Sequence, residues 1–482
     1  MPKGLTRFDA ALQPPASVRP LWLDGLLPDE PAYPPLAAST SADVCIVGGG
    51  FTGLWTALAL KARSPETDVL LIDGDVCGGG ASGRNGGFAM TWWSKFPTLE
   101  KACGTEAALA LCRRSEAAVV DIGRFCEEHG IDAWYRRGGW LWTATSTAQL
   151  DAWDGTLSAL ERAGAEPFER LGRYEVTELS GSPVHLAGVR EASTATIQPA
   201  LLARGLAEVA RSAGVRIHER TPMTALVRGP SSLVMTPGGV VTAGCVVLAL
   251  NAWAAQLPEV AKSLVVVASD MIATEPLGER GDALTWPLGL AISDSRRLVH
   301  YYRRTDDGRI AFGKGGGALA LGGRIGPSFH CSSPRVDEVG GQFRRTYPRL
   351  ADVGIDSSWR GPIDYSISGL PFFCRLDGSP KVVVCAGFSG NGVGPAKVAG
   401  DVLAEMALEG GHAGLPAALT RLPSSRLPPE PFRYAGGRLV RAAVARKERI
   451  EDRGRRPDVV TRTVAALDPT SFIDRSASKP RA

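Results

Sequence analysis

A glycine-rich turn between an apolar segment and a helical segment constrains the fold of this chain more than any other feature. Residues 43–47 have the short apolar pattern of a buried strand, and residues 54–63 carry Leu and Ala at helical spacing. The turn between them has the form Gly48-x-Gly50-x-x-Gly53. We therefore predict a strand, a tight turn and a helix in direct succession, which open a nucleotide-binding β-α-β unit.

Each part of this unit suits a dinucleotide. The three glycines permit a tight turn, the approach of a pyrophosphate and close helix–strand packing, and the helix N-terminus offers free N–H groups to phosphate. A second strand at 69–73 ends in Asp73, whose carboxylate can accept hydrogen bonds from both ribose hydroxyls and would repel a 2′-phosphate. The alternative is a glycine-rich turn in an ordinary α/β core. The predicted contacts are Gly48, Gly50, Phe51, Thr52, Gly53, Asp73 and Gly74.

The segment after the second strand favours FAD over NAD. An NAD domain continues there with a helix, whereas residues 78–87 contain too many glycines for one. Such a loop offers a run of backbone donors that suits the far end of a long cofactor, near a flavin ring, although it could also be a flexible surface loop. The predicted contacts in it are Gly80, Ala81, Ser82, Arg84, Asn85, Gly86 and Gly87.

Composition excludes several classes of function. The 482 residues include 54 Lys and Arg against 50 Asp and Glu, and a net charge of +4 gives no argument for a nucleic-acid partner. The nine cysteines form no CxxC pair, so they indicate neither a disulfide framework nor a zinc site, and the histidines show no ligand spacing. We expect a cytoplasmic protein without a membrane segment and without a metal.

Two segments, 43–57 and 81–88, together resemble the FAD-dependent D-amino-acid-oxidase superfamily. Within it the chain is most similar to the gamma-glutamylputrescine oxidase-like branch, which stands beside the glycine and sarcosine oxidases. The resemblance continues along nearly the whole chain in matching order and spacing, through residues 21–24, 198–202, 249–253, 301–313, 387–393 and 436–441.

The resemblance implies an α/β fold: a glutathione-reductase-type FAD-binding Rossmann domain with an inserted α+β substrate domain that contains an antiparallel sheet. The implied boundaries are 1–95, 170–260 and 360–435 for the FAD domain, 96–169 and 261–359 for the substrate domain, and 436–482 for a basic C-terminal helix and tail. Residues 438–456 are basic enough to suggest nucleic-acid binding, but they also contain acids and allow an amphipathic helix docked on the body.

The resemblance also implies further cofactor contacts. Met223 would lie near the adenosine half, with Asn251 and Trp253 from the segment 249–253 as additional contacts. A third motif would approach the pyrimidine end of the flavin through Gly387, Phe388, Ser389, Gly390, Asn391, Gly392 and Val393. Asn391 stands where relatives commonly have histidine. Because Ile363 falls where sarcosine oxidases have the cysteine that binds flavin covalently, we predict non-covalent FAD.

Candidate catalytic residues lie on a predicted hairpin over 298–314. Alternation places His300 and Tyr302 on one face and Tyr301 on the other, and His300 and Tyr302 shape the pocket if their face is the flavin side. Plain aromatic packing is the alternative. Lys314 near the ring would favour oxygen reduction, unless it is a solvated strand end.

Three further side chains come from elsewhere in the chain. Arg360 could bind a substrate carboxylate or phosphonate, or form an interface salt bridge. Tyr365 and Trp92 are weaker candidates for an aromatic wall.

The family reaction removes a hydride from the carbon next to an amine, which gives an imine and then a carbonyl, with O2 reduced to H2O2. The expected partners are therefore a small-molecule amine and O2. A monooxygenase that uses NAD(P)H, an amine dehydrogenase that passes electrons to a carrier, and a non-catalytic flavoprotein are the alternatives. The sequence leaves open the oligomeric state and the choice among primary amines, secondary amines and aminophosphonates.

Overall fold

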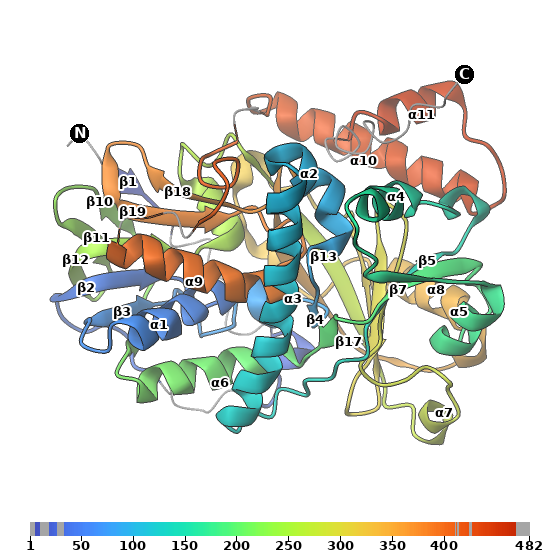
Figure 1. The fold of residues 1–482 in the computed structure, drawn as a ribbon, viewed down its shortest axis with the longest axis horizontal. Helices are drawn as coiled ribbons and strands as arrows, with labels where there is room; N and C mark the ends of the chain where they lie inside the picture. Colours follow the sequence, from blue (N-terminus) through green and yellow to red (C-terminus); the bar gives the residue numbers. More distant parts are fainter. Residues whose placement is uncertain are drawn as a thin grey trace.

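The computed structural model describes residues 5–9, 19–26, 33–409, 411, 414–423 and 427–468. The end of the predicted basic tail, 469–482, therefore lies outside the described residues. In Figure 1 the elements named below can be followed from the N-terminus to the C-terminal helices.

In the described residues, nine strands form the first sheet. Its five central strands are parallel, and both faces of such a sheet are covered, which is why they read as continuous apolar runs. In spatial order they are β9 (Arg216–His218), β3 (Val69–Ile72), β2 (Thr40–Val47), β12 (Gly239–Leu248) and β19 (Ser379–Ala386). The antiparallel additions are β18 (Phe372–Leu376) beside β19, and β11 (Ser232–Thr236), β10 (Ala225–Val227) and β1 (Leu5–Arg7) beside β12.

Helices cover one face of this sheet and share a large apolar core with it (Figure 1). The covering helices are α1 (Phe51–Arg63), α3 (Thr105–Glu128), α6 (Pro199–Ser212) and α9 (Val393–Glu409). The predicted β-α-β unit is confirmed as β2, α1 and β3.

The second sheet has eight strands in the described residues. Neighbouring strands are antiparallel except for β14 and β5, which confirms the predicted antiparallel portion near 265–315. In order they are β17 (Ile355–Ser366), β13 (Leu264–Thr274), β16 (Ile310–Lys314), β15 (His300–Arg304), β14 (Ala291–Asp294), β5 (Trp140–Ala144), β7 (Ala187–Glu191) and β6 (Phe168–Leu171).

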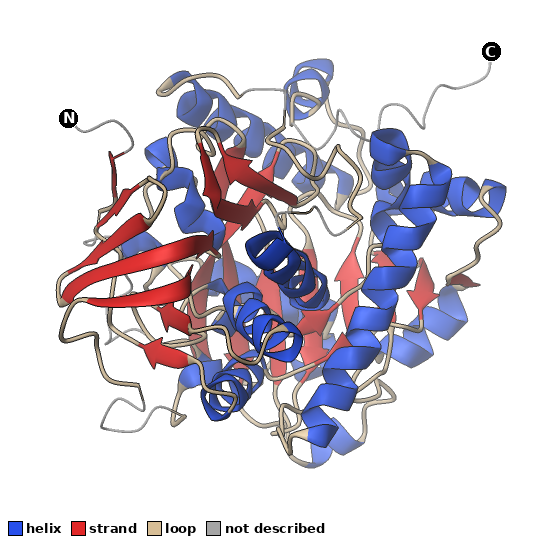
Figure 2. Ribbon diagram, turned by 60° about the vertical axis from the view of Figure 1, so that its left-hand side comes forward, coloured by secondary structure: helices blue, strands red, loops and turns tan. Residues whose placement is uncertain are grey.

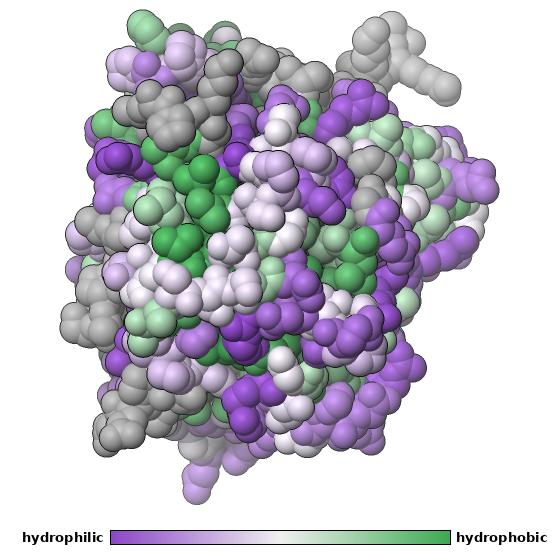
Figure 3. Space-filling view, turned by 90° about the vertical axis from the view of Figure 1, so that its left-hand side faces the viewer, coloured by the Kyte–Doolittle hydropathy of each residue, from purple (hydrophilic) through white to green (hydrophobic). Residues whose placement is uncertain are grey.

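Helices α5 (Arg173–Ser180) and α8 (Val336–Thr346) pack on the second sheet through a core of their own. In Figure 2 helices lie in front of the strands and to their right, while strands form the left-hand edge of the molecule. The face seen in Figure 3 mixes hydrophilic and hydrophobic residues. The remaining elements are the two-stranded β4 (Phe88–Ala89) and β8 (Ala195–Thr196), and the helices α2 (Phe96–Cys103), α4 (Asp154–Arg162) and α7 (Glu279–Asp282).

Two strands do not follow the predicted domain boundaries. Strand β17 crosses the predicted boundary between 359 and 360. Strand β7, predicted in the FAD domain, belongs to the second sheet. The division into an FAD domain and a substrate domain stays a prediction.

The C-terminal region forms α10 (Phe432–Glu451) and α11 (Val459–Ala465). Helix α10 buries Val444 and Glu448 against the rest of the protein, as an amphipathic docked helix does. None of the helices in the described part of the chain combines the length and the apolar character that a bilayer crossing requires.

Candidate functional site

A cavity of about 740 Å³ lies between the two sheets. Its wall takes residues from the turns after the parallel strands β2, β3, β12 and β19, and from strands of the second sheet. Crevices at the carboxyl ends of parallel strands are the usual ligand sites of such folds, and this volume suits an organic ligand.

The turn after β2 is shaped by its glycines. Gly48 has a φ of +113°, and a β-carbon there would lie 2.4 Å from the carbonyl oxygen of Ala249. A β-carbon at Gly53 would lie 1.9 Å from the carbonyl oxygen of Gly48. Gly53 therefore permits close packing of α1 and does not itself line the cavity, whereas Gly48, Gly50, Phe51 and Thr52 do.

Asp73 stands at the end of β3, in the cavity wall with Gly74. Its carboxylate accepts hydrogen bonds from the backbone N–H of Gly49 (2.6 Å) and of Asp75 (2.7 Å). Burial raises the pKa of Asp73 to about 7. The carboxylate is thus held at the edge of the cavity where the sequence predicts a ribose.

Most residues of the loop over 78–87 also line the cavity. Gly80, Ala81, Ser82, Arg84, Asn85 and Gly86 line the cavity. The Asn85 side chain holds the loop, because its Nδ2 donates to the carbonyl of Ser82 (2.8 Å) and its Oδ1 accepts from the N–H of Gly87 (2.7 Å). Gly87 lies behind the wall, since a β-carbon there would lie 2.2 Å from the carbonyl oxygen of Ile197.

The third motif is built around Asp364 of β17, a residue that sequence reasoning missed. The backbone N–H of Gly387 donates to Oδ2 of Asp364 at 2.5 Å, and the N–H of Ser389 donates to its carbonyl at 3.2 Å. Burial raises the pKa of Asp364 to about 7. Gly387 lies behind the wall, packed on Ser366, while the residues that line it are Phe388, Ser389, Gly390, Asn391, Gly392 and Val393.

The three other predicted cofactor contacts line the cavity as well: Met223, Asn251 and Trp253. The wall presents three buried oxygen atoms without a protein hydrogen-bond partner, which are Oδ1 of Asn251, Asp364 and Asn391. Buried polar atoms in proteins are normally paired, so these oxygens are suited to polar groups of a ligand.

The face of the hairpin that borders the cavity is opposite to the one expected. Tyr301 lines the cavity, and its hydroxyl hydrogen-bonds Oγ of Ser269 at 2.8 Å. Tyr302 is 1% exposed and stacks on Phe312 at 4.8 Å in the core under α8. Alternation defined the two faces, but the packing of α8 selects the Tyr302 face for the core.

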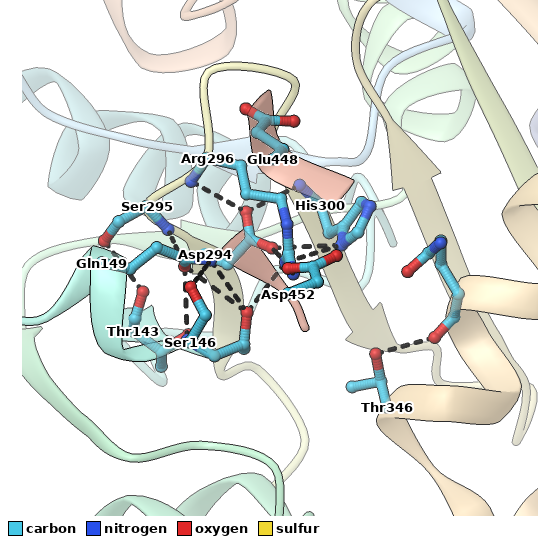
Figure 4. A network of polar contacts seen from close by, with 12 residues as sticks. Thr143, Ser146, Gln149, Asp294, Ser295, Arg296, His300, Thr346, Glu448 and Asp452 are labelled. Atoms are coloured by element: carbon cyan, nitrogen blue, oxygen red, sulfur yellow. Dashed lines mark hydrogen bonds and ion pairs between the residues drawn. The ribbon is translucent and has the colours of Figure 1, made fainter. Parts of the chain in front are cut away.

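His300 lies behind the cavity wall in a buried polar network with Asp294 and Arg296 (Figure 4), and Lys314 contacts this network through His300. Nδ1 of His300 lies 3.1 Å from Oδ2 of Asp294, and its Nε2 lies 3.0 Å from Nζ of Lys314. Arg296 joins Asp294 to Asp452, just beyond α10. Lys314 is therefore neither a solvated strand end nor a cation of the cavity wall, because the residue is 6% exposed and its ammonium group is bound to His300.

Arg360 also lies outside the cavity wall. Its Nε lies 2.7 Å from Oδ1 of Asp270 and its Nη2 lies 3.2 Å from Oδ2. Both side chains are buried, and Asp270 also binds Arg335 at 3.0 Å. The Arg360 guanidinium, which we expected to bind a substrate carboxylate, instead binds the carboxylate of Asp270. This arrangement corresponds to the salt-bridge alternative.

The wall residues of the second sheet were largely missed by sequence reasoning. Besides Tyr301, the structure brings Ser269, Ile363, Tyr365, Trp140, Trp142 and Val299 to the cavity. Tyr365 was a weak candidate, whereas Trp92 is buried in the core. The loop 295–299 carries Arg297 to the wall, and Glu448 of α10 accepts from the N–H of Arg297 at 2.8 Å. No sequence motif marks these contacts.

Comparison with known proteins decides the family. The model of the family described as FAD dependent oxidoreductase matches residues 43–406. The chain belongs to the FAD dependent oxidoreductase family. This result confirms the expected family and its cofactor, FAD.

Among relatives in this family, the chain is 33% identical to the probable oxidoreductase OrdL of Rhizobium meliloti (strain 1021) over 90% of this chain and 96% of the relative. It is 31% identical to gamma-glutamylputrescine oxidoreductase of Escherichia coli (strain K12), over 84% of this chain and 91% of that protein. The crystal structure of glycine oxidase from Geobacillus kaustophilus has the same fold, with a TM-score of 0.66, 22% identity, and coverage of 80% of this chain and 99% of that one.

The residues present fit FAD. Gly48, Gly50 and the N-terminus of α1 would hold the pyrophosphate, Asp73 the ribose, and the loops at 80–86 and 388–393 the flavin end. None of the nine cysteines lines the cavity, so the wall offers no thiol for a covalent link to the flavin. Among the described residues, no group of His, Cys, Asp and Glu side chains is placed to hold a metal ion.

Proposed function

We propose that this chain is an amine or amino-acid oxidase, which oxidises a CH–NH or CH–NH2 bond and uses O2 as the electron acceptor. The observation that carries this proposal is the position of Tyr301 and Ser269, which face the cavity from the second sheet across from the loops suited to the flavin end of FAD. A relative of similar length is named gamma-glutamylputrescine oxidoreductase, and a protein of the same fold is named glycine oxidase. Both names support an amine substrate.

FAD, when bound, would supply the redox chemistry of the reaction, which is acceptance of the two electrons of the substrate and their transfer to O2 to give H2O2. The substrate loses a hydride from the carbon next to nitrogen and a proton from nitrogen, and the resulting imine is hydrolysed to a carbonyl and an amine. The chain's own residues must bind the neutral amine, orient its carbon and keep water away.

Tyr301 is suited to orient the substrate and unsuited to remove a proton. Burial raises the pKa of its phenol, so the hydroxyl stays protonated. It donates to Oγ of Ser269, which itself donates to the carbonyl of Lys314, and the phenol oxygen can accept a hydrogen bond from the amine. Asp294 borders the cavity, but its carboxylate is bound to Arg296 and to His300, and these charges hold its pKa below the usual range. This wall therefore supports hydride removal from an amine that is already neutral.

We also propose the domain division and location predicted from the sequence. The glycine turns on the first sheet and Tyr301 on the second support one domain for FAD and one for the substrate. All nine cysteines are free thiols, which supports the reducing environment of the cytoplasm.

Oxygen uptake and H2O2 formation over a panel of amines test the function. The panel includes gamma-glutamylputrescine, putrescine, glycine, sarcosine, proline and 2-aminoethylphosphonate, and mass spectrometry identifies the carbonyl product. One mole of H2O2 for each mole of amine consumed, without NADPH, is expected. Oxygen consumption that requires NADPH would contradict the proposal and favour a monooxygenase. Turnover only with an artificial electron carrier would indicate a dehydrogenase.

A further inference from the structure

Arg303 is a buried arginine next to the flavin-side loop. It lies on β15 two residues after Tyr301, on the same face, and is 1% exposed. Its guanidinium lies over the ring of Trp22 at 5.2 Å, and its Nη2 donates to the carbonyl of Ile197 at 2.6 Å. These partners are neutral, so neither forms an ion pair with the guanidinium, and only the more distant Asp306 and Asp307 favour its charge.

No carboxylate in the described residues forms an ion pair with Arg303. Its Nε and Nη1 are buried without a hydrogen-bond partner. The nearest acids along the chain are already paired, because Asp306 binds Arg136 (2.6 Å) and Asp307 binds Arg309 (3.0 Å). Burial lowers the pKa of Arg303 to about 10, so the side chain remains charged at neutral pH.

Two other buried arginines near the cavity have carboxylate partners. Arg296 is bound to Asp294 and Asp452, and Arg360 is bound to Asp270. Charges buried in proteins are normally paired, because an unpaired one is strongly destabilising. A partner that arrives from outside the chain would remove this cost.

Only one layer of backbone separates Arg303 from the cavity. A β-carbon at Gly87 would lie 2.9 Å from Nη2 of Arg303, and the preceding residues Asn85 and Gly86 line the cavity. Trp22 holds this layer in place, because its Nε1 donates to the carbonyl of Asn85 at 2.8 Å. The loop begins beside the N-terminus of α1, where Ser82 accepts from the N–H of Phe51 at 2.9 Å, and runs to Gly86, which adjoins Tyr301; its end at 85–87 is therefore the part that lies away from the pyrophosphate.

We propose that Arg303 supplies the positive charge that stabilises the reduced flavin and so raises the reduction potential of the bound FAD. Reduction by hydride adds two electrons and one proton to the neutral ring, so the reduced ring carries one negative charge. The other proton, which the substrate loses from nitrogen, goes to solvent. The interior excludes water, so its effective dielectric constant is low. A guanidinium on the far side of one layer of backbone therefore still attracts this negative charge. Arg303 acts through space and does not touch the substrate.

The test is the reduction potential of the flavin in Arg303→Met, measured anaerobically against a reference dye with a chemical reductant. The equilibrium constant for reduction should fall about tenfold, which corresponds to about 30 mV for a two-electron couple. Arg303→Lys keeps the charge and should stay within a factor of three of the wild type. Arg304→Met is the matched control, because Arg304 is the next residue on the opposite face, where its Nη1 donates to the carbonyl of Trp286 (2.7 Å). It should leave the potential unchanged.

A second measurement separates this role from a structural one. Without FAD, Arg303→Met removes a buried charge that has no ion-pair partner in the described residues, so the melting temperature of the apoprotein should equal or exceed that of the wild type. An unchanged potential in Arg303→Met would overturn the proposal. So would an apoprotein of Arg303→Met that melts below the wild type, because the charge would then be compensated within the chain. Since a dye and a chemical reductant are used, neither outcome depends on which amine is the substrate.

Discussion

Tyr301 and Tyr302 are adjacent in β15, and the structure assigns them opposite roles. Tyr301 faces the cavity, where its hydroxyl bonds Ser269. The hydroxyl of Tyr302 lies 3.2 Å from Nε2 of His185 in the core. Burial lowers the pKa of His185 to about 4, so the imidazole is neutral and shares a hydrogen bond with the Tyr302 hydroxyl through Nε2. The substitutions Tyr301→Phe and Tyr302→Phe remove the same hydroxyl from the two faces.

Tyr302→Phe should lower stability and leave catalysis unchanged. It leaves Nε2 of the fully buried His185 without its partner, which costs about 1–3 kcal/mol. An unfolding entropy of about 2.1 cal/mol/K per residue gives about 1 kcal/mol/K for a chain of 482 residues. The melting temperature should therefore fall by about 1–3 °C. The value of kcat/KM should equal that of the wild type.

Tyr301→Phe should have the opposite pattern. A hydrogen bond lost from the cavity wall costs about 1–1.5 kcal/mol, which corresponds to a decrease of about five- to tenfold in kcat/KM. Stability should change little, because Oγ of Ser269 still donates to the carbonyl of Lys314 at 3.2 Å. Steady-state kinetics and thermal melts of both holoenzymes provide the test. A loss of kcat/KM in Tyr302→Phe with an unchanged melting temperature would refute the assigned faces.

Three other substitutions test different parts of the structure. Burial raises the pKa of Glu191 to about 8. The stability that the neutral carboxyl contributes is therefore complete below pH about 4.3 and is lost as the pH rises through 8. Thermal melts across this range should show a smaller decrease in melting temperature in Glu191→Gln than in wild type. Asp270→Asn leaves Arg360 buried without its carboxylate and should cost about 3–5 kcal/mol in denaturant unfolding, while an unchanged stability would contradict the pairing. Gly53→Ala places a β-carbon 1.9 Å from a carbonyl oxygen, so the purified protein should lack flavin absorbance, and full FAD content would contradict the packing.

The parts of the fold that depend on local pattern could be predicted from the sequence. The apolar strand, the glycine turn and the helix of the β-α-β unit lie within about 30 residues, and each is determined by its neighbours in the chain. Helix α9 begins at Val393, the last residue of the third motif, directly after the glycines of that motif.

The catalytic side of the cavity could not be predicted because it depends on contacts between distant segments. Arg360 binds a carboxylate from a different strand, and the packing of α8 decides which face of β15 is buried. Asp364 is one of several polar residues in β17, and its role becomes visible only where the turn at Gly387 approaches it. Periodicity gave two faces for the hairpin and no means of choosing between them.

The most direct measurement is an anaerobic absorbance titration of the purified protein with the amine that the panel identifies. One equivalent of this amine, without NADPH, should bleach the flavin band completely, and air should restore the band while one equivalent of H2O2 forms. A flavin that stays oxidised with every amine of the panel and is reduced only by NADPH would contradict the assignment as an amine oxidase.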